Sequence, residues 1–97
     1  MININPDYQL QIPHWIVIVS KLYIMHLNNE KAFNTVLAIK LKITYSHIYR
    51  IITDLIALGY VKRVRCGRIK YLSLTPSGLK LAILSYKLEQ RVNLSIG

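Results

Sequence analysis

One stretch, residues 44–75, constrains the fold more than any other part of this 97-residue chain. From Ile48 onward its apolar side chains recur every three or four residues, and this spacing predicts one buried face of a helix. Thr44 precedes that helix, where its hydroxyl can accept a hydrogen bond from a backbone N–H of the first turn. Gly59 follows it, at the place where a left-handed residue commonly ends a helix. We therefore expect a helix over residues 44–58.

A basic hairpin is predicted to follow this helix. Residues 60–65 and 69–74 are two short runs rich in β-branched and aromatic side chains, and Gly67 between them gives the freedom that a tight turn needs. The hairpin contains no acidic side chain and five basic ones: Lys62, Arg63, Arg65, Arg68 and Lys70. An isoleucine-rich helix, a glycine and a basic hairpin, in this order, indicate a surface that binds nucleic acid.

Four segments resemble the winged helix-turn-helix domain of small transcriptional regulators, in particular the MarR-like kind. They are AIKLKIT (38–44), SHIYRIITDLIALGYV (46–61), the basic hairpin, and LTPSGLKLA (74–82). The resemblance covers about residues 14–90. It implies an α+β, mainly α fold, in which a three-helix core carries a two- to three-stranded antiparallel wing over residues 60–74 and an extra C-terminal helix. The small size and the richness in Ile, Lys and Tyr also resemble the compact regulators of thermophilic archaea and their viruses.

The other elements follow from local signals. Pro13 suits the first position of a helix because its missing N–H would be unpaired there, and Thr75 followed by Pro76 is a helix start. Lys42 stands where the family often has glycine, and a left-handed lysine in that turn costs about 1 kcal/mol. In chain order we expect an arm at residues 1–13, then a domain over 14–97 with a helix at 14–27, a brief strand at 32–33, a helix at 36–41 capped by Asn34 or Thr35, and a last helix at 76–92.

Positive charge is concentrated in one part of the chain. Eight of the thirteen Lys and Arg residues lie between residues 40 and 70, where Asp54 is the only acid and is expected to pair with a nearby cation. Such a concentration is the electrostatic footprint of a nucleic-acid binder. A merely soluble basic surface is the alternative, and the coincidence of the charge with the helix and the hairpin favours nucleic acid.

The resemblance implies that helix 44–58 lies in the major groove and that the wing contacts the backbone or the minor groove. Base edges in the major groove present distinct donor and acceptor patterns, and the N-terminal residues of a reading helix face them. Arg50 is the predicted bidentate partner of guanine, whereas Tyr45 and Tyr49 can instead pack against the preceding helix. The predicted DNA contacts are Tyr45, Ser46, His47, Tyr49, Arg50, Thr53, Lys40, Lys42, Arg63, Arg65, Arg68 and Lys70, although any single cation among them can also be a solvated surface charge.

The chain also has more large apolar side chains than a small monomer needs, with 15 isoleucines and 14 leucines against four alanines. The predicted helices at 14–27 and 76–92 carry apolar residues on more than one face, and a second apolar face needs a cover. We expect a homodimer through these two helices, where the resembled regulators usually dimerise. Ile18 and Ile83 represent the two faces.

No pattern in the sequence indicates catalysis. His14, His26 and His47 have no metal-ligand spacing with one another or with Cys66. The four acids lie in different predicted segments and form no carboxylate pair, and no glycine-rich phosphate loop is present. We therefore expect no enzyme activity, no metal, no cofactor and no small-molecule effector. The lone Cys66 excludes an internal disulfide, and an incidental free thiol is favoured over a redox switch.

The sequence also bears on where the protein acts. The longest apolar run, residues 15–19, is too short to cross a bilayer. The N-terminal MININPDYQ lacks the basic region of a secretory signal. We therefore expect no membrane partner and a cytoplasmic location, which is the host cytoplasm if the protein is viral.

Taken together, the residues predict a sequence-specific regulator of transcription that binds double-stranded DNA as a homodimer. The alternative is a winged-helix module that binds a protein or RNA without reading a DNA sequence. Arg50 beside a wing rich in Arg and Lys favours the first interpretation, because a module that only binds protein has no need of that combination.

Overall fold

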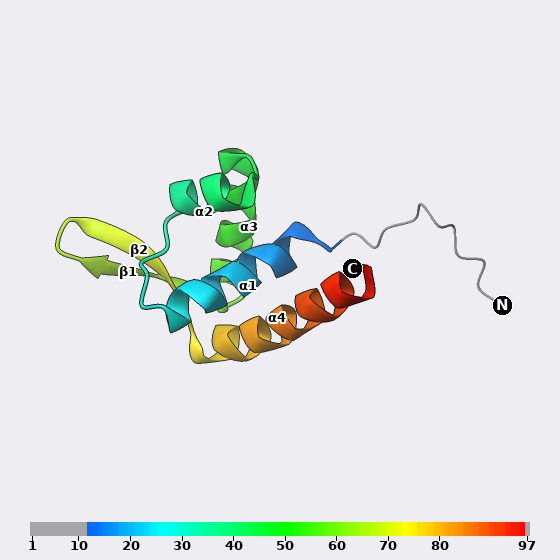
Figure 1. Ribbon diagram of the computed structural model, residues 1–97. Helices are drawn as coiled ribbons and strands as arrows, with labels where there is room; N and C mark the ends of the chain where they lie inside the picture. The colour runs from blue at the N-terminus through cyan, green and yellow to red at the C-terminus, as the bar shows by residue number, and fades with distance from the viewer. Residues whose placement is uncertain (1–11, 97) are drawn as a thin grey trace.

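The computed structural model describes residues 12–96, with side chains up to residue 92. Its elements are α1 (His14–Leu27), α2 (Asn34–Leu41), α3 (Tyr45–Ala57), β1 (Val61–Cys66), β2 (Ile69–Leu74) and α4 (Pro76–Ile96), as Figure 1 shows. Helices predominate and the two strands form one antiparallel hairpin, so the predicted winged helix-turn-helix fold is confirmed. Of the expected N-terminal arm, residues 1–11 lie outside the described part of the chain.

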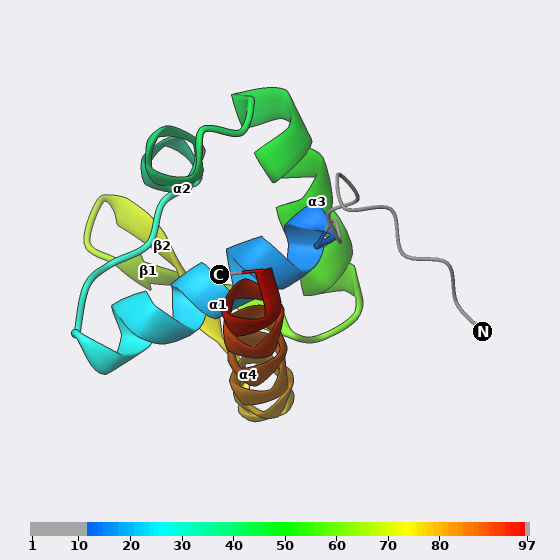
Figure 2. The ribbon, with the colours of Figure 1, turned by 45° about the vertical axis from the view of Figure 1, so that its right-hand side comes forward.

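Helix α1 lies in the middle of the domain. Helices α2 and α3 cover one side of it, and α4 runs along the other in the opposite direction (Figures 1 and 2). The ring centroids of Tyr23 on α1 and Tyr86 on α4 are 5.5 Å apart. The core is therefore built around α1, and its buried members are Ile18, Val19, Leu22, Met25, Ala32, Leu37, Ile48, Ile52, Leu55, Val61, Leu72 and Ala82.

This central position removes Ile18 from any surface that a second subunit could cover, whereas the expected dimer through α1 and α4 stays a prediction. Ile18, which represented the exposed face, has no accessible surface. Most of the apolar surface of α1 is covered within the chain, because helices pack on two of its sides. Among the large apolar side chains that remain exposed, Trp15 and Leu27 lie at the two ends of α1, Ile39 lies on α2, and Leu84 and Leu88 lie on α4.

The turn between α2 and α3 has the strained geometry that the sequence indicates. Lys42 has φ 56° and ψ 42°, which is the left-handed conformation. The Ile43 N–H then donates to the Ala38 carbonyl oxygen at 3.2 Å, and the half-buried Ile43 side chain packs against the core. The short turn thereby fixes the angle at which α3 leaves α2.

Two predicted caps are wrong. Helix α2 begins at Asn34, earlier than expected, with Phe33 rather than Asn34 or Thr35 in the capping position. The reason is the bridge between Ala32 and Leu72, which holds the preceding chain extended as far as the helix start. Thr44 does precede α3, but its hydroxyl makes no capping hydrogen bond. The predicted brief strand amounts to this single bridge.

The hairpin begins where α3 ends. Gly59 has φ 83°, so a left-handed residue ends α3 as predicted. Cys66 pairs with Ile69, which leaves Gly67 (φ 63°) and Arg68 as the turn. Cys66 therefore belongs to the strand rather than to the turn that the sequence suggested.

The start of α4 is tied to the end of α3. The Gly78 N–H donates to the Thr75 hydroxyl at 3.0 Å, and this hydroxyl donates to the Gly59 carbonyl oxygen at 2.6 Å. A side chain at Gly78 would clash with the Tyr60 carbonyl oxygen. The Leu-Thr-x-x-Gly segment thus packs α4 closely on the junction between α3 and β1. Helix α4 then continues to Ile96, further than the predicted end at residue 92.

Candidate nucleic-acid interface

Helix α3 separates its apolar and polar side chains cleanly. Ile48, Ile52 and Leu55 are buried against the core. The side chains of Tyr45, Ser46, Tyr49, Arg50 and Thr53 are exposed, all as predicted for the contact face. His47 is only half-buried and turns toward α1, so it lies at the edge of this face rather than in it.

The two exposed tyrosines form a pair. Tyr45 and Tyr49 stack with ring centroids 6.4 Å apart, and they remain 49% and 51% exposed. Their flat rings are therefore available to a ligand. Thr53 is less available, because its hydroxyl donates to the Tyr49 carbonyl oxygen at 2.8 Å within the same helix.

A basic hollow lies on one side of this face. It has a volume of about 480 Å³ and is lined by Lys42 and Arg50 together with Ser46, His47 and His14. The left-handed turn places Lys42 next to the start of α3, as the predicted role requires. A negatively charged group in this hollow would be near two permanent cations.

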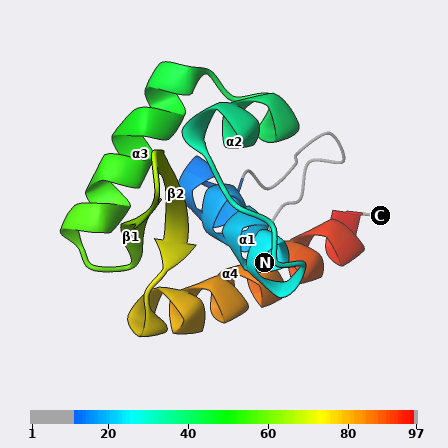
Figure 3. The same ribbon diagram turned by 90° about the vertical axis from the view of Figure 1, so that its left-hand side faces the viewer.

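A second basic hollow lies between the start of α3 and the wing. It has a volume of about 230 Å³ and is lined by Arg63 and Lys70 of the wing, by Tyr45, and by residues at the start of α2. The sequence placed Arg63 and Lys70 in the wing but could not show that they adjoin α3. The structure brings these cations next to α3, and Figure 3 shows the wing and α3 from the wing side.

The remaining predicted cations lie further out. The Arg65 Nε donates to the Gly67 carbonyl oxygen at 3.2 Å, which folds this side chain over the turn. Arg68 is exposed in the turn itself. Lys40 forms an ion pair with Glu30 at 3.2 Å. Since surface pairs of this kind contribute about 0–1 kcal/mol, the pairing leaves Lys40 able to exchange its partner.

One neighbour of α3 was not predicted. His14, the first residue of α1, packs its ring against that of His47, with the centroids 4.9 Å apart. The two histidines are far apart in the sequence, so no local spacing could reveal their contact. Within residues 12–96, no group of three or more His, Cys, Asp and Glu side chains is arranged to hold a metal ion.

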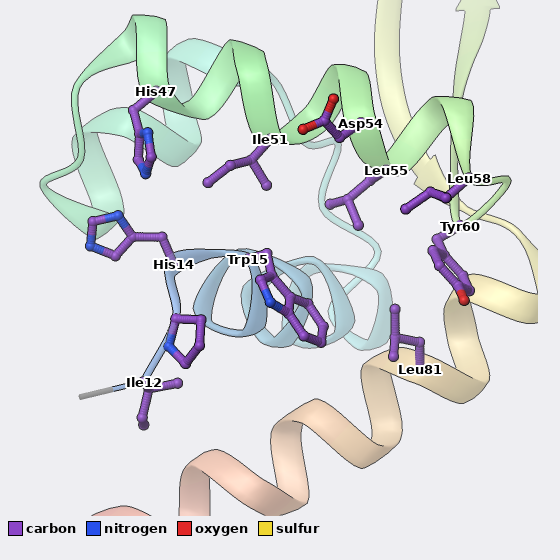
Figure 4. Close-up of a pocket in the computed structure, with 11 residues that line it drawn as sticks. Ile12, His14, Trp15, His47, Ile51, Asp54, Leu55, Leu58, Tyr60 and Leu81 are labelled. Carbon is purple, nitrogen blue, oxygen red and sulfur yellow. The ribbon is translucent and has the colours of Figure 1, made fainter. Parts of the chain in front are cut away.

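A third hollow lies behind α3, away from its polar face. It has a volume of about 670 Å³ and is lined mostly by apolar side chains of α1, α3 and α4, among them Trp15, Ile51 and Leu81 (Figure 4). Asp54 also lines it. The expected ion pair of Asp54 with a lysine or arginine is absent from the described residues.

In the described part of the chain, no helix combines the length and the apolar character needed to cross a membrane. Cys66 is a free and exposed thiol.

Comparison with known proteins identifies the fold. No protein-family model matches the sequence, and no curated protein matches it. Solved structures do match. AF1382 from Archaeoglobus fulgidus has 19% identity and a TM-score of 0.67, over 86% of this chain and 88% of that one.

Two bacterial structures are also similar. The MarR family transcriptional regulator SPO1453 from Silicibacter pomeroyi DSS-3 has 25% identity and a TM-score of 0.69, over 90% of this chain and 60% of that one. A mutant of ZitR from Lactococcus lactis has 20% identity and a TM-score of 0.71, over 98% of this chain and 62% of that one. The chain thus spans about three-fifths of the length of these two proteins. It has the winged helix-turn-helix fold of MarR-like transcriptional regulators.

Proposed function

We propose that this protein is a sequence-specific regulator of transcription that binds double-stranded DNA as a homodimer. The observation that carries the proposal is the pair of basic hollows, one on each side of the exposed face of α3. The major groove is about 12 Å wide and admits one helix. A helix that lies in it has a phosphate backbone on both sides, and the two hollows provide cations for both.

The residues then divide into two roles. Arg50 and Ser46 lie on the exposed face at the N-terminal half of α3, from which base edges are reached. Lys42 on one side, and Arg63 with Lys70 on the other, hold phosphates and fix the register of the helix. Phosphate contacts of this kind position a protein but carry no sequence information directly.

The wing tip extends the contact beyond the groove. Arg65 and Arg68 are exposed at the end of the hairpin, where they contact the backbone or enter the minor groove next to the site of α3. The tip contains no acidic residue that would oppose this approach.

The experiment that tests the proposal is a titration of the protein with random duplex and with duplex from its own promoter, across a series of salt concentrations. Log affinity should fall linearly with log salt, because each phosphate contact releases condensed counterions. One duplex should bind more tightly than random DNA of equal length. Binding that is equally weak for every duplex and independent of salt would exclude the proposal.

The stacked pair Tyr45–Tyr49 favours one rival, an RNA-binding module. Exposed aromatic rings can stack on unpaired bases, and these two rings are half exposed. Competition decides between the two functions: the DNA interpretation predicts that single-stranded RNA displaces promoter duplex poorly. Displacement by RNA at equal or lower concentration would favour the rival.

A further inference from the structure

Two imidazoles meet between the helices. His14 begins α1 and His47 is in the first turn of α3, and their rings lie 4.9 Å apart between centroids with an angle of 73° between the planes. In Figure 4 the ring of His47 points from α3 toward that of His14, and a ring nitrogen of each lies on the side that faces the other. The contact joins two elements that share no backbone hydrogen bond there.

This separation suits a shared metal ion. Zinc binds imidazole nitrogen at about 2.0–2.1 Å in a tetrahedral arrangement, which places two ligating rings roughly 5 Å apart between centroids. Imidazole is a ligand that zinc, nickel and copper accept readily. The two rings thus already stand at the separation that a bridging ion requires.

Both rings are free for this use. Within residues 12–96 neither imidazole makes a hydrogen bond, and their only described interaction is with each other. Both line the 480 Å³ hollow on one side and the 670 Å³ hollow on the other. Water can therefore reach the space between them and complete the coordination of an ion.

The surrounding charges set the strength of the site. Lys42 and Arg50 line the smaller hollow and repel a divalent cation. Asp54 also lines the larger hollow, but it lies about two turns along α3 from His47, so its attraction for an ion between the rings is weak. With two protein ligands and open positions, binding depends on chelation by both rings at once, and it should be reversible rather than structural.

We propose that His14 and His47 form a two-imidazole site for a divalent transition-metal ion, which links the start of α1 to the first turn of α3. The proposal goes beyond DNA binding, since the ion binds without DNA. A bound ion would hold the first turn of α3 against the start of α1, the central helix of the domain.

The first test is calorimetric titration of the purified full-length chain with Cu²⁺, Ni²⁺ and Zn²⁺. We expect one ion per chain, with Cu²⁺ bound most tightly, as the Irving–Williams order requires. His14→Gln and His47→Gln should each lower the affinity at least tenfold. The double variant should lose little more than either single one, because one chelate is already broken. The matched control is His26→Gln, which changes the exposed third histidine at the end of α1 and should leave binding unchanged.

A second measurement does not depend on glutamine variants. In the unaltered protein, paramagnetic Cu²⁺ should broaden the imidazole NMR signals of His14 and His47 before those of His26. His47→Phe keeps a ring against His14 but removes the ligand, so it should keep the thermal melting temperature of the metal-free protein and lose the rise on adding Zn²⁺.

Three outcomes would overturn the proposal. They are no binding in the unaltered protein below millimolar metal, equal affinity in the glutamine variants of His14 and His47, and an equal loss with His26→Gln. All three outcomes are measured without DNA, so a failure of metal binding can be distinguished from a failure of the proposed DNA binding.

Discussion

At the scale of single residues, Arg50 and Arg68 are both exposed arginines with different expected roles. Arg50 lies on the helix that faces base edges, so Arg50→Ala should cost about 1–3 kcal/mol on the correct site and little on random DNA. The measurement is the ratio of the two affinities at one salt concentration, and this ratio should fall toward one.

Arg68→Ala provides the matched comparison at the wing tip. A lost phosphate contact weakens all duplexes alike and lowers the salt slope by about 1. The same titrations, repeated at several salt concentrations, measure that slope. If Arg68→Ala abolished sequence preference while Arg50→Ala only lowered the salt slope, the wing and not α3 would read the sequence.

Lys42 gives a prediction for stability. Its left-handed conformation costs a non-glycine residue roughly 1–2 kcal/mol, whereas glycine loses roughly 0.5–1 kcal/mol more chain entropy on folding. Lys42→Gly should therefore raise the free energy of unfolding by about 0.5–1 kcal/mol while weakening DNA binding.

The measurement is the free energy of unfolding from urea denaturation, compared between proteins for which this free energy has the same slope against urea concentration. Asn29 also has φ 56°, and asparagine tolerates this conformation better than lysine. Asn29→Gly should therefore stabilise less than Lys42→Gly. A destabilised Lys42→Gly protein would show that the turn holds no strain that glycine relieves.

A residue of the candidate interface could be predicted only where its position follows from a pattern among nearby residues in the sequence. The exposed face of α3 follows from the spacing of its isoleucines, so Tyr45, Tyr49 and Arg50 were placed outward correctly. Whether these residues contact DNA stays a prediction. The contact of His14 with His47 depends on how α1 packs under α3, and no local pattern records that packing.

At the scale of elements, Gly78 limits how α4 can pack. A β-carbon there would clash with the Tyr60 carbonyl oxygen, which is backbone and cannot rotate away. Gly78→Ala should lower the free energy of unfolding by about 1–3 kcal/mol, the usual cost of overpacking. The measurement is the urea midpoint.

Ser77→Ala, at the exposed neighbouring position of the same helix, is the control and should change stability by less than about 0.5 kcal/mol. Equal effects of the two substitutions would mean that α4 shifts to accommodate the new side chain.

The types of the elements and most of their boundaries could be predicted from the sequence, because glycine, proline and the spacing of apolar residues each determine the structure of the segment in which they lie. Gly59 and Thr75 ended and started their helices as expected. The caps of α2 and α3 could not be predicted, since hydrogen bonding at a helix start depends on where the previous segment is held. For α2 that segment is fixed by Leu72, far along the chain.

At the scale of the whole molecule, the surplus of apolar side chains is divided between the core, which includes Ile18, and exposed positions on α1 and α4, and the dimer predicted from it stays a prediction. Sequence periodicity cannot tell a helix at the centre of a domain from one at an interface, since both are apolar on several faces. Ile18 is in the core, so a charged residue there would unfold the chain and report nothing about assembly.

The exposed stripe of α4 carries the revised dimer prediction. Leu84 and Leu88 are 65% and 48% exposed one helical turn apart. Light scattering should give twice the chain mass of 11.2 kDa, and Leu84→Glu with Leu88→Glu should reduce it to one chain mass. Lys87→Glu changes charge between them without removing apolar surface, so it should stay dimeric. A monomeric unaltered protein at micromolar concentration would refute the dimer.

The dimer also has a geometric consequence for DNA. Two recognition helices related by a two-fold axis meet half-sites about 10 base pairs, or ~34 Å, apart. Five additional base pairs between the half-sites turn one of them to the opposite face of the duplex. That insertion should weaken binding to the promoter as strongly as the loss of Arg50.

The bridge from Ala32 to the wing has a further consequence, in the kinetics of solvent exchange. The Leu72 N–H donates to the Ala32 carbonyl oxygen at 2.8 Å, while Gly67 and Arg68 form the exposed turn at the far end of the hairpin. An isolated hairpin is marginally stable in water, so the wing is anchored at its base and opens from its tip. Deuterium should therefore replace the amide protons of Cys66 and Ile69 long before that of Leu72. A wing that is held at its base and free at its tip can adjust the position of the tip to the local width of a DNA groove.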